Sequence, residues 1–283
     1  MSPIKNPTTF FAYIRRAPFG GRLTQGQIDG VNAILDAWEY FKLTDHRWLA
    51  NILAQVFHET GGRILPVRET FASTDKAAIA NLEKAWKAGK LSSVKTPYWR
   101  EGWFGRGQIQ ITHKANYLKL GQRLGVDLVK NPAKTLDPVI GARIAIVGMA
   151  EGLFTGKKLG DFFSHNTDDP VGARAIVNGS NKAKLIATYH KAFLDAIEAA
   201  RGAVDAADAL PEAAIADDVK PAESSTVMSL LGGTVGTAGM SALLGVNNPW
   251  GFGIAALVLL LGAGAGYMFL SGRWSVNRIK GHA

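Results

Sequence analysis

Residues 45–62 read Asp-His-Arg-Trp-Leu-Ala-Asn-Ile-Leu-Ala-Gln-Val-Phe-His-Glu-Thr-Gly-Gly. This is the most informative stretch of the sequence. Its large apolar residues recur at helical spacing and two glycines end the pattern, which predicts a helix from about Asp45 to Glu59. Glu59 follows Val56 by three residues, so its carboxyl group lies on the apolar stripe at the last turn. Partial burial and a helix C-terminus both favour a protonated carboxyl, as a general acid requires. The structural alternative is a glutamate paired with Arg63 or Arg68.

A second carboxylate, Glu69, follows ten positions later in a stretch predicted to be extended from about Arg63 to Phe71. The Gly61-Gly62 turn would bring this stretch across the end of the helix. Two facing carboxylates suit glycosidic hydrolysis, in which one protonates the leaving oxygen and the other activates water or attacks the anomeric carbon. An ion pair between Glu69 and Arg68 or Arg106 is the structural alternative.

The third informative stretch is Trp103-Phe-Gly-Arg-Gly-Gln-Ile-Gln-Ile-Thr-His-Lys-Ala-Asn-Tyr117. Strict alternation predicts a strand over 108–112, with Gln108, Gln110 and Thr112 on one face and the isoleucines on the other. Amides and a hydroxyl beside aromatic residues suit a sugar polymer. Polar alternation is equally ordinary for a half-exposed strand.

The rest of residues 1–200 is predicted to be mostly helical. Apolar spacing predicts a helix from about 25 to 41. Asp137-Pro138 and Asp169-Pro170 each place a capping acid before a first-turn proline, which predicts two further helix starts. The expected fold class is therefore α+β, mainly α-helical, with a small β element.

Three segments in this order resemble glycoside hydrolase family 19: His-Glu-Thr-Gly-Gly at 58–62, the run at 104–117, and Ile-Val-Asn-Gly at 176–179. That family comprises chitinases and related bacterial and bacteriophage endolysins. The resemblance covers roughly residues 20–200 and implies a lysozyme-like, two-lobed domain with an inverting mechanism. It implies Glu59 as general acid, Glu69 as general base and Thr112 as the hydroxyl that holds the attacking water. The substrate-binding residues expected from these segments are His58, Trp103, Gln110, Asn116, Tyr117 and Asn178.

The sequence departs from the family pattern at a few positions. Gln108 stands where the family commonly has proline. The arginine often found soon after the Asn-Gly pair is missing, which leaves Lys182 or Lys184 as substitutes. The sequence around Glu69 is the least distinctive match, so Glu83 and Glu101 are alternative bases.

Composition narrows the function classes. The chain has 283 residues, of which 47% are hydrophobic and 19% charged, and this composition excludes wholesale disorder. It contains no cysteine, which excludes disulfides and Cys-ligated metals. No metal or other cofactor is expected, since His58 and Glu59 are neighbours and not a ligand pair. Residues 1–200 hold 27 Lys and Arg against 17 Asp and Glu, a net charge of +10. This favours an anionic cell-wall polymer; no motif indicates nucleic acid, and no obligate protein partner is evident.

The chain is expected to be organised in five parts. Residues 1–200 form the catalytic domain, and residues 201–226 form an acidic Ala/Pro-rich linker that is not expected to bury a core. No charged residue occurs from 227 to 272. Residues 227–248 are a candidate second hydrophobic segment, residues 249–271 a transmembrane helix, and residues 272–283 a basic tail. The N-terminal residues do not have the pattern of a cleavable signal peptide.

These features predict a phage or prophage endolysin that hydrolyses peptidoglycan and is tethered to the host inner membrane through its C-terminal helix. With one span, the positive-inside rule places the catalytic domain in the periplasm. With two spans, the domain stays in the cytoplasm. The alternatives for activity are a chitinase acting on N-acetylglucosamine polymers and a non-catalytic, membrane-tethered wall-binding protein.

Overall fold

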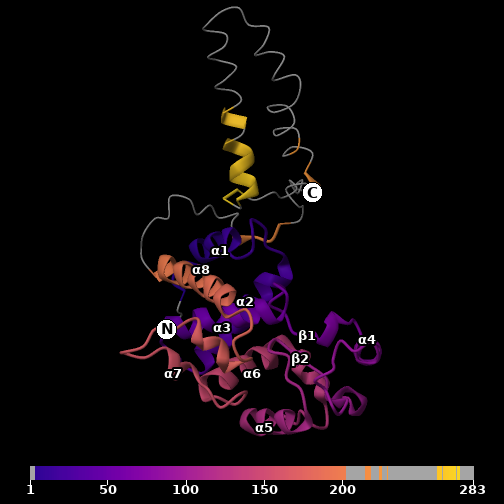
Figure 1. Cartoon of the computed structure of the whole chain (residues 1–283). Coiled ribbons are helices and arrows are strands. Elements are labelled where there is room, and N and C mark those ends of the chain that lie inside the picture. The colour runs from indigo at the N-terminus through magenta and orange to yellow at the C-terminus, as the bar shows by residue number, and fades with distance from the viewer. Residues whose placement is uncertain are drawn as a thin grey trace, which may run out of the picture. The chain divides into compact units, whose positions relative to one another are not determined.

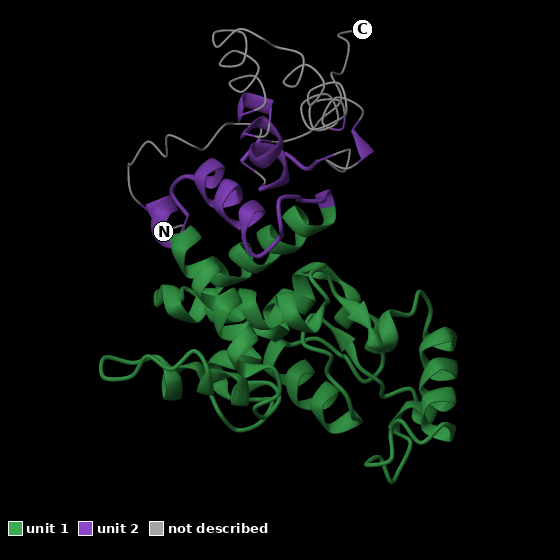
Figure 2. Ribbon diagram, turned by 45° about the horizontal axis from the view of Figure 1, so that its top comes forward, with its two compact units in different colours: residues 1–3, 26–197 green, residues 4–25, 198–283 purple. Residues whose placement is uncertain are grey.

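The computed structural model describes residues 4–201, 214–217, 223–224, 228, 260–262, 264–271 and 273–274. The chain divides into two compact units, coloured separately in Figure 2. Among the described residues, unit 1 comprises Gly26–Ile197, and unit 2 comprises Ile4–Gln25 together with those from Glu198 onward.

Helices dominate the described chain, and a single two-stranded sheet accompanies them, so the predicted mainly helical α+β class is confirmed. In chain order the elements labelled or traced in Figure 1 are α1 (Pro7–Arg16), α2 (Gln25–Tyr40), α3 (His46–Glu59), β1 (Val67–Arg68), η1 (Glu69–Phe71), α4 (Asp75–Lys87), η2 (Tyr98–Glu101), β2 (Arg106–Gly107), α5 (Lys114–Leu124), η3 (Pro132–Leu136), α6 (Pro138–Glu151), α7 (Leu159–Phe162), η4 (Gly172–Ile176) and α8 (Ala183–Arg201), where η denotes a 3-10 helix.

Local signals account for the long helices. Asp45 caps α3 by accepting from the backbone N–H of Arg47 at 2.9 Å, and Asp137 caps α6 by accepting from Val139 at 2.9 Å. The predicted helices at 25–41, at 45–59 and after Asp137 are thus confirmed. Asp169 also caps, accepting from the N–H of Gly172 at 2.8 Å, but only the short 3-10 helix η4 follows.

The sheet is smaller than the sequence predicts. Strand β1 pairs with β2 in antiparallel register, with Val67 opposite Gly107. The predicted strand at 108–112 is wrong, because Gln110 adopts a left-handed φ of 53° and the chain turns back. Ile111 then pairs with Arg106, its N–H donating to the Arg106 carbonyl at 3.0 Å. The extended stretch predicted from Arg63 to Phe71 likewise ends early, in the 3-10 helix η1.

The core of unit 1 lies between its helices. Helix α3 packs against α6, and α5 packs against α6 from another side. The cluster between α5 and α6 comprises Ile111, Tyr117, Leu120, Leu128, Ile144 and Val147, all buried. A second cluster fixes α4 against η2 and comprises Ala78, Leu82, Trp99 and Phe104. These two clusters hold the segments before and after β2 in place.

Unit 2 contains a buried ion pair between residues far apart in sequence. The guanidinium of Arg15, on α1, contacts the carboxylate of Asp217, and both side chains are almost completely buried. Asp217 also accepts from the N–H of Leu23 and donates its own N–H to the Leu23 carbonyl, each at 2.8 Å. The acidic linker predicted at 201–226 therefore does bury a side chain, because a paired carboxylate can enter an interior that an isolated one cannot.

The two hydrophobic segments predicted at 227–248 and 249–271 lie largely outside the described residues. Within the ranges that the structure describes, no helix combines the length and apolar character needed to cross a membrane.

Candidate functional site

The side chain of Glu59 is held by an ion pair. Glu59 is the last residue of α3, and its carboxylate Oε1 lies 2.6 Å from Nη1 of Arg174, on η4. The Glu59 side chain is 16% exposed and that of Arg174 only 2%. Pairing of Glu59 with Arg63 or Arg68, the structural alternative, does not occur: Arg68 pairs with Asp75.

Arg174 has two further acceptors besides Glu59. Its Nη1 donates to Oε1 of Gln55 at 2.8 Å, and its Nε donates to the carbonyl of Asn181 at 3.1 Å. Gln55 in turn donates to the carbonyl of Ala173 at 3.2 Å, so the contacts between α3 and η4 are reciprocal. Arg174 is therefore a fixed part of the Glu59 site.

Sequence reasoning missed Arg174. It expected a cation after Asn178 and offered Lys182 or Lys184, both of which are exposed. The cation that reaches Glu59 instead precedes Asn178. Its only signal in the sequence is an arginine among small and apolar residues in Gly172–Ile176, a pattern that predicts burial with a partner.

Glu69 begins η1 and is oriented by two donors. The hydroxyl of Tyr98 donates to Oε1 of Glu69 at 2.8 Å, and the backbone N–H of Gly105 donates to Oε2 at 2.7 Å. The backbone N–H of Glu69 also donates to the Gly105 carbonyl at 2.7 Å. Burial raises the pKa of Tyr98, and the hydrogen bond to Glu69 raises it further, so the phenol stays a donor at neutral pH. The alternative ion pair with Arg68 or Arg106 is not formed.

The two carboxylate segments meet at one contact. A Cβ added to Gly61, two residues after Glu59, would lie 3.2 Å from Cζ of Phe71, two residues after Glu69. Gly61 itself has a φ of 58°, so the turn after α3 relies on glycine for both conformation and space. The Gly61-Gly62 turn therefore does bring the stretch after α3 back to the helix end.

The comparisons with known proteins cover this part of the chain. Residues 41–151 match the family model described as Chitinase class I, glycoside hydrolase family 19. The matched residues include Glu59, Glu69 and Thr112, whereas Arg174 and Asn178 lie beyond them.

Similar proteins carry chitinase names. Chitinase 11 of Oryza sativa subsp. japonica is 36% identical over 107 residues, which are 36% of this chain and 35% of that protein. An acidic endochitinase of Solanum chilense is 51% identical over 47 residues, 16% of this chain and 19% of that protein. The matches thus span about a third or less of these relatives. Among solved structures, chitinase C from Streptomyces griseus aligns over 72% of this chain and 96% of its own, at 20% identity and a TM-score of 0.42.

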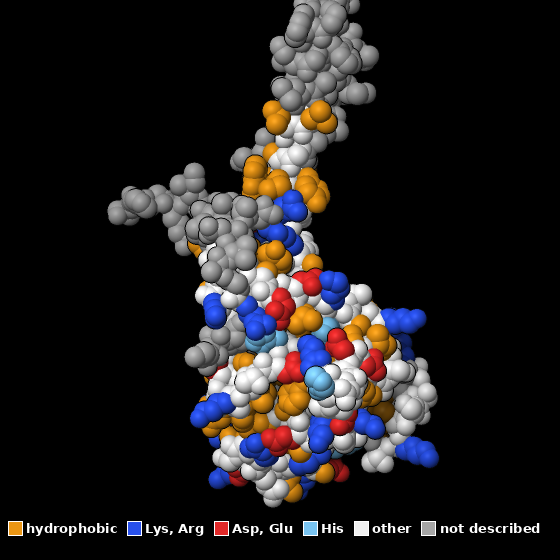
Figure 3. Space-filling model, turned by 90° about the vertical axis from the view of Figure 1, so that its left-hand side faces the viewer, with side chains coloured by type: hydrophobic (Ala, Val, Ile, Leu, Met, Phe, Trp, Pro, Cys, Tyr) orange, Lys and Arg blue, Asp and Glu red, His pale blue; other side chains and the backbone are white. Residues whose placement is uncertain are grey.

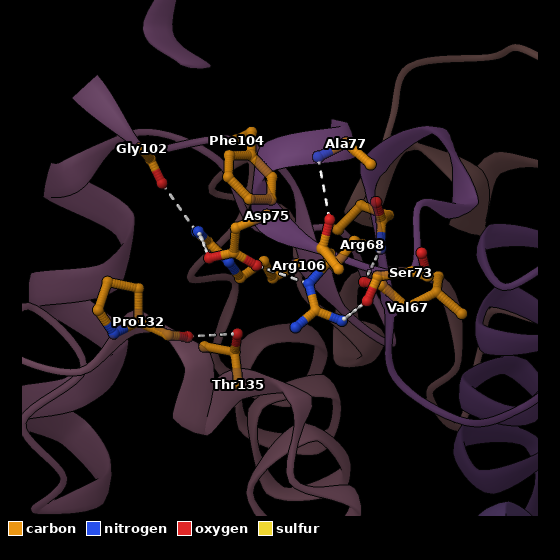
Figure 4. A network of polar contacts seen from close by, with 12 residues as sticks. Val67, Arg68, Ser73, Asp75, Ala77, Gly102, Phe104, Arg106, Pro132 and Thr135 are labelled. Carbon is orange, nitrogen blue, oxygen red and sulfur yellow. Dashed lines mark hydrogen bonds and ion pairs between the residues drawn. The ribbon is translucent and has the colours of Figure 1, made fainter. Parts of the chain in front are cut away.

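Asp75 braces strand β2 (Figure 4). Its carboxylate pairs with Nη2 of Arg106 at 2.7 Å and with Nε of Arg68 at 2.6 Å, and these two arginines lie opposite each other in the sheet. Arg106 also donates to the carbonyl of Gly102 at 2.8 Å and lies over the ring of Phe104. Arg106 therefore helps to hold the loop that presents Gly105 to Glu69, and Arg68 is engaged with the same carboxylate of Asp75.

The alternative bases have other surroundings. Glu83 pairs with Arg100 at 2.7 Å and accepts from the indole of Trp99 at 3.1 Å; its hydrogen bonds with Arg100 and Trp99 lower its pKa to about 2. Glu101 is exposed at the end of η2. Neither shares the contacts of Glu69 with Tyr98 and Gly105, so Glu69 remains the candidate base.

The side chains of Gln108 and Gln110 donate hydrogen bonds to backbone carbonyl groups. Gln108 was expected on the binding face, but it is buried and donates to the carbonyl of Ile64 at 2.6 Å. Gln110 donates to the carbonyls of Val67 and Gly107, at 2.8 and 2.9 Å. Because the turn at Gln110 replaces the predicted strand, these amides join the turn to β1 and to the loop before it.

The remaining expected site residues divide between surface and core. Tyr117 is fully buried, its hydroxyl donates to the carbonyl of Phe104 at 2.9 Å, and it is a packing residue that has no surface to offer a substrate. Trp103 is half-buried against it. Asn116 and Thr112 are half-buried, and the Asn116 amide donates to the Thr112 carbonyl at 2.8 Å. Asn178 is exposed.

His58 adjoins Glu59 and is half-buried. Burial lowers the pKa of His58; the negative charge of Glu59 opposes this, while Arg174 and Lys182 lower it further. His58 is therefore a neutral imidazole at neutral pH, available as a hydrogen-bonding group. In the parts of the chain that the structure describes, no three His, Asp or Glu side chains gather into a metal site.

Proposed function

We propose that the protein is an endolysin-type glycosidase that hydrolyses β-1,4 bonds of peptidoglycan glycan strands with inversion of configuration. The observation that carries this proposal is the pair of separately held carboxylates, Glu59 with Arg174 and Glu69 with Tyr98 and Gly105, on segments that meet at Gly61 and Phe71. The match of residues 41–151 to the family 19 model supports the reaction class.

In this proposal Glu59 protonates the glycosidic oxygen as the bond to the anomeric carbon breaks. Glu69 accepts a proton from the water that attacks the opposite face of the sugar, and Thr112 helps to hold that water. Arg174 keeps its contacts with Gln55 and Asn181 when Glu59 carries a proton, so the cation is not left without acceptors during the cycle. Glu69 accepts two hydrogen bonds, as suits an ionised base.

We favour peptidoglycan as the proposed substrate because residues 1–200 carry a net charge of +10 and the wall polymer is anionic. On the face shown in Figure 3, Lys and Arg side chains are interspersed with Asp and Glu side chains. The positions of individual cations near the site therefore matter more for substrate binding than the net charge of residues 1–200. The second candidate substrate is chitin, favoured by the chitinase names of the similar proteins.

Purified full-length protein should release new reducing ends from peptidoglycan or from chitin oligomers, and NMR of the first product should show the inverted anomer. Glu59→Gln should abolish release and Glu69→Gln should remove most of it. Glu83→Gln is the matched control, because that carboxylate serves Arg100, and it should leave the rate unchanged. Absence of product from both polymers would instead favour a non-catalytic wall-binding protein.

The proposal includes tethering to the host inner membrane through residues 249–271, with the catalytic domain in the periplasm. The uncharged run from 227 to 272, followed by Arg273, Arg278 and Lys280, supports it. Protease added to spheroplasts that express the full chain should digest the catalytic domain. Complete protection would place that domain in the cytoplasm, as two spans require.

A further inference from the structure

Arg63 and Phe71 form a stacked pair on the segments that follow the two candidate catalytic carboxylates. The guanidinium carbon of Arg63 lies 4.4 Å from the centroid of the Phe71 ring. Both residues are exposed, Phe71 to 51%. We call these two residues the Arg63–Phe71 pair; it presents an aromatic surface and a cation together.

The pair packs on the turn that follows Glu59. A Cβ added to Gly61 would lie 3.2 Å from Phe71 and 3.3 Å from Nη1 of Arg63, so the pair packs closely on this glycine. Arg63 follows Glu59 by four residues, and Phe71 follows Glu69 by two. The pair is thus attached to both carboxylate segments.

The backbone that carries Phe71 is held in an unfavourable conformation. Thr70 and Phe71 have φ values of 61° and 56°, in the left-handed region that non-glycine residues rarely adopt. Asn81, on α4, donates to the Thr70 hydroxyl at 3.1 Å and helps to hold the turn. Such strain concentrates at functional sites, and here it accompanies an exposed, large apolar ring.

The charge of Arg63 has no carboxylate partner among the described residues. The neighbouring arginines are engaged: Arg68 and Arg106 pair with Asp75, and Arg174 pairs with Glu59. Arg63 donates only a long bond from Nη1 to the Thr60 carbonyl, at 3.4 Å. A guanidinium has five N–H donors in a planar fork, so most of them remain available to a ligand.

We infer that Arg63, positioned by Phe71, binds a carboxylate of the substrate next to the scissile bond. A planar guanidinium recognises a carboxylate through two parallel hydrogen bonds. Peptidoglycan carries carboxylates on the side groups of its glycan strand, whereas chitin carries none. Resting on the proposed function, this inference makes Arg63 the residue that selects the anionic wall polymer over neutral chitin.

The experiment compares one polymer with and without its charge. Peptidoglycan and peptidoglycan whose carboxyl groups have been amidated are given to the full-length wild type, to Arg63→Gln and to Arg63→Lys. The measured quantity is the ratio of kcat/KM on the native polymer to kcat/KM on the amidated polymer. Arg63→Gln should lower this ratio roughly tenfold or more, and Arg63→Lys should lower it less, since lysine keeps the charge but not the fork.

The matched control is Lys119→Gln, which removes an exposed positive charge from α5 and should leave the ratio at the wild-type value. An unchanged ratio in Arg63→Gln, or an equal change in Lys119→Gln, overturns the inference. Sedimentation of Glu59→Gln and of Glu59→Gln/Arg63→Gln with both polymers measures binding without turnover. A wild type without activity on any polymer defeats the proposed function, and the binding comparison still decides whether Arg63 recognises the carboxylates.

Discussion

Nη1 of Arg174 lies 2.6 Å from Oε1 of Glu59 and 2.8 Å from Oε1 of Gln55, so a single buried guanidinium nitrogen serves both side chains of α3. Replacing Arg174 with methionine would leave the partly exposed Glu59 carboxylate without its cation. Breaking a fully buried pair costs about 3–5 kcal/mol, and we expect a smaller loss of stability in urea unfolding because Glu59 keeps some contact with water. We also expect kcat per folded molecule to fall at least roughly tenfold, since Glu59 loses its fixed position. Near-normal turnover in folded Arg174→Met would show that Glu59 needs no cation.

Tyr98→Phe tests the orientation of Glu69. The variant removes the hydroxyl that donates to Oε1 and keeps the ring that packs edge-on against Trp99. A hydrogen bond to a charged group contributes about 1.5–3 kcal/mol to stability, so the melting temperature should fall, and kcat/KM per folded molecule should fall roughly tenfold or more because Glu69 loses a donor that orients it. Tyr40→Phe, on an exposed tyrosine, is the control. A Tyr98→Phe enzyme with wild-type kcat/KM would separate Glu69 from catalysis.

His190 makes stability depend on pH. It is 3% exposed, stacks parallel to Phe163 at 5.2 Å, and burial lowers its pKa to about 4. Because the unfolded chain binds a proton near pH 6.5 and the folded chain does not, His190's contribution is complete above pH 6.5 and is lost as the pH falls towards 4. We expect a loss of about 2 kcal/mol between pH 7.5 and pH 5. Urea titrations at both values check this, and His190→Gln should flatten the difference; an equal slope in that variant would assign the acid sensitivity elsewhere.

Asp217→Asn tests whether the segment at 214–217 belongs to the folded protein. The variant leaves Arg15 buried without its counter-charge, so unit 2 should lose about 3–5 kcal/mol and unfold at a lower temperature. Asp195→Asn, which breaks the exposed pair with Lys191, is the control and should cost no more than about 0.5 kcal/mol. Calorimetry of the full chain measures both. Equal melting curves for the two variants would mean that the Arg15 contact contributes nothing.

Features determined by neighbouring residues were predictable from the sequence. The caps Asp45 and Asp137 and the apolar spacing between them and the helix ends located α3 and α6, and so placed Glu59 at a helix terminus. The resemblance to family 19, carried by the segments at 58–62, 104–117 and 176–179, implied the reaction class.

Features determined by distant contacts were not predictable in the same way. Alternation predicted a strand at 108–112, yet Gln110 turns the chain because its amide can bond Val67 and Gly107, which periodicity does not report. Arg174 reaches Glu59 across 115 positions, and no local pattern pairs them. From the sequence, Asp217 was predicted to be a solvent-exposed acid of the linker, because its buried partner, Arg15, lies 202 positions away.

The Arg15 contact also determines how force would travel through the chain. After α8 ends at Arg201, the chain is fastened again at Asp217, to α1 and to Leu23. A pull from beyond Asp217 would first load its ion pair with Arg15 and its two hydrogen bonds with Leu23, before tension reaches α8. Mechanical load from the C-terminal side would thus enter through α1, and α8 would be spared from unwinding.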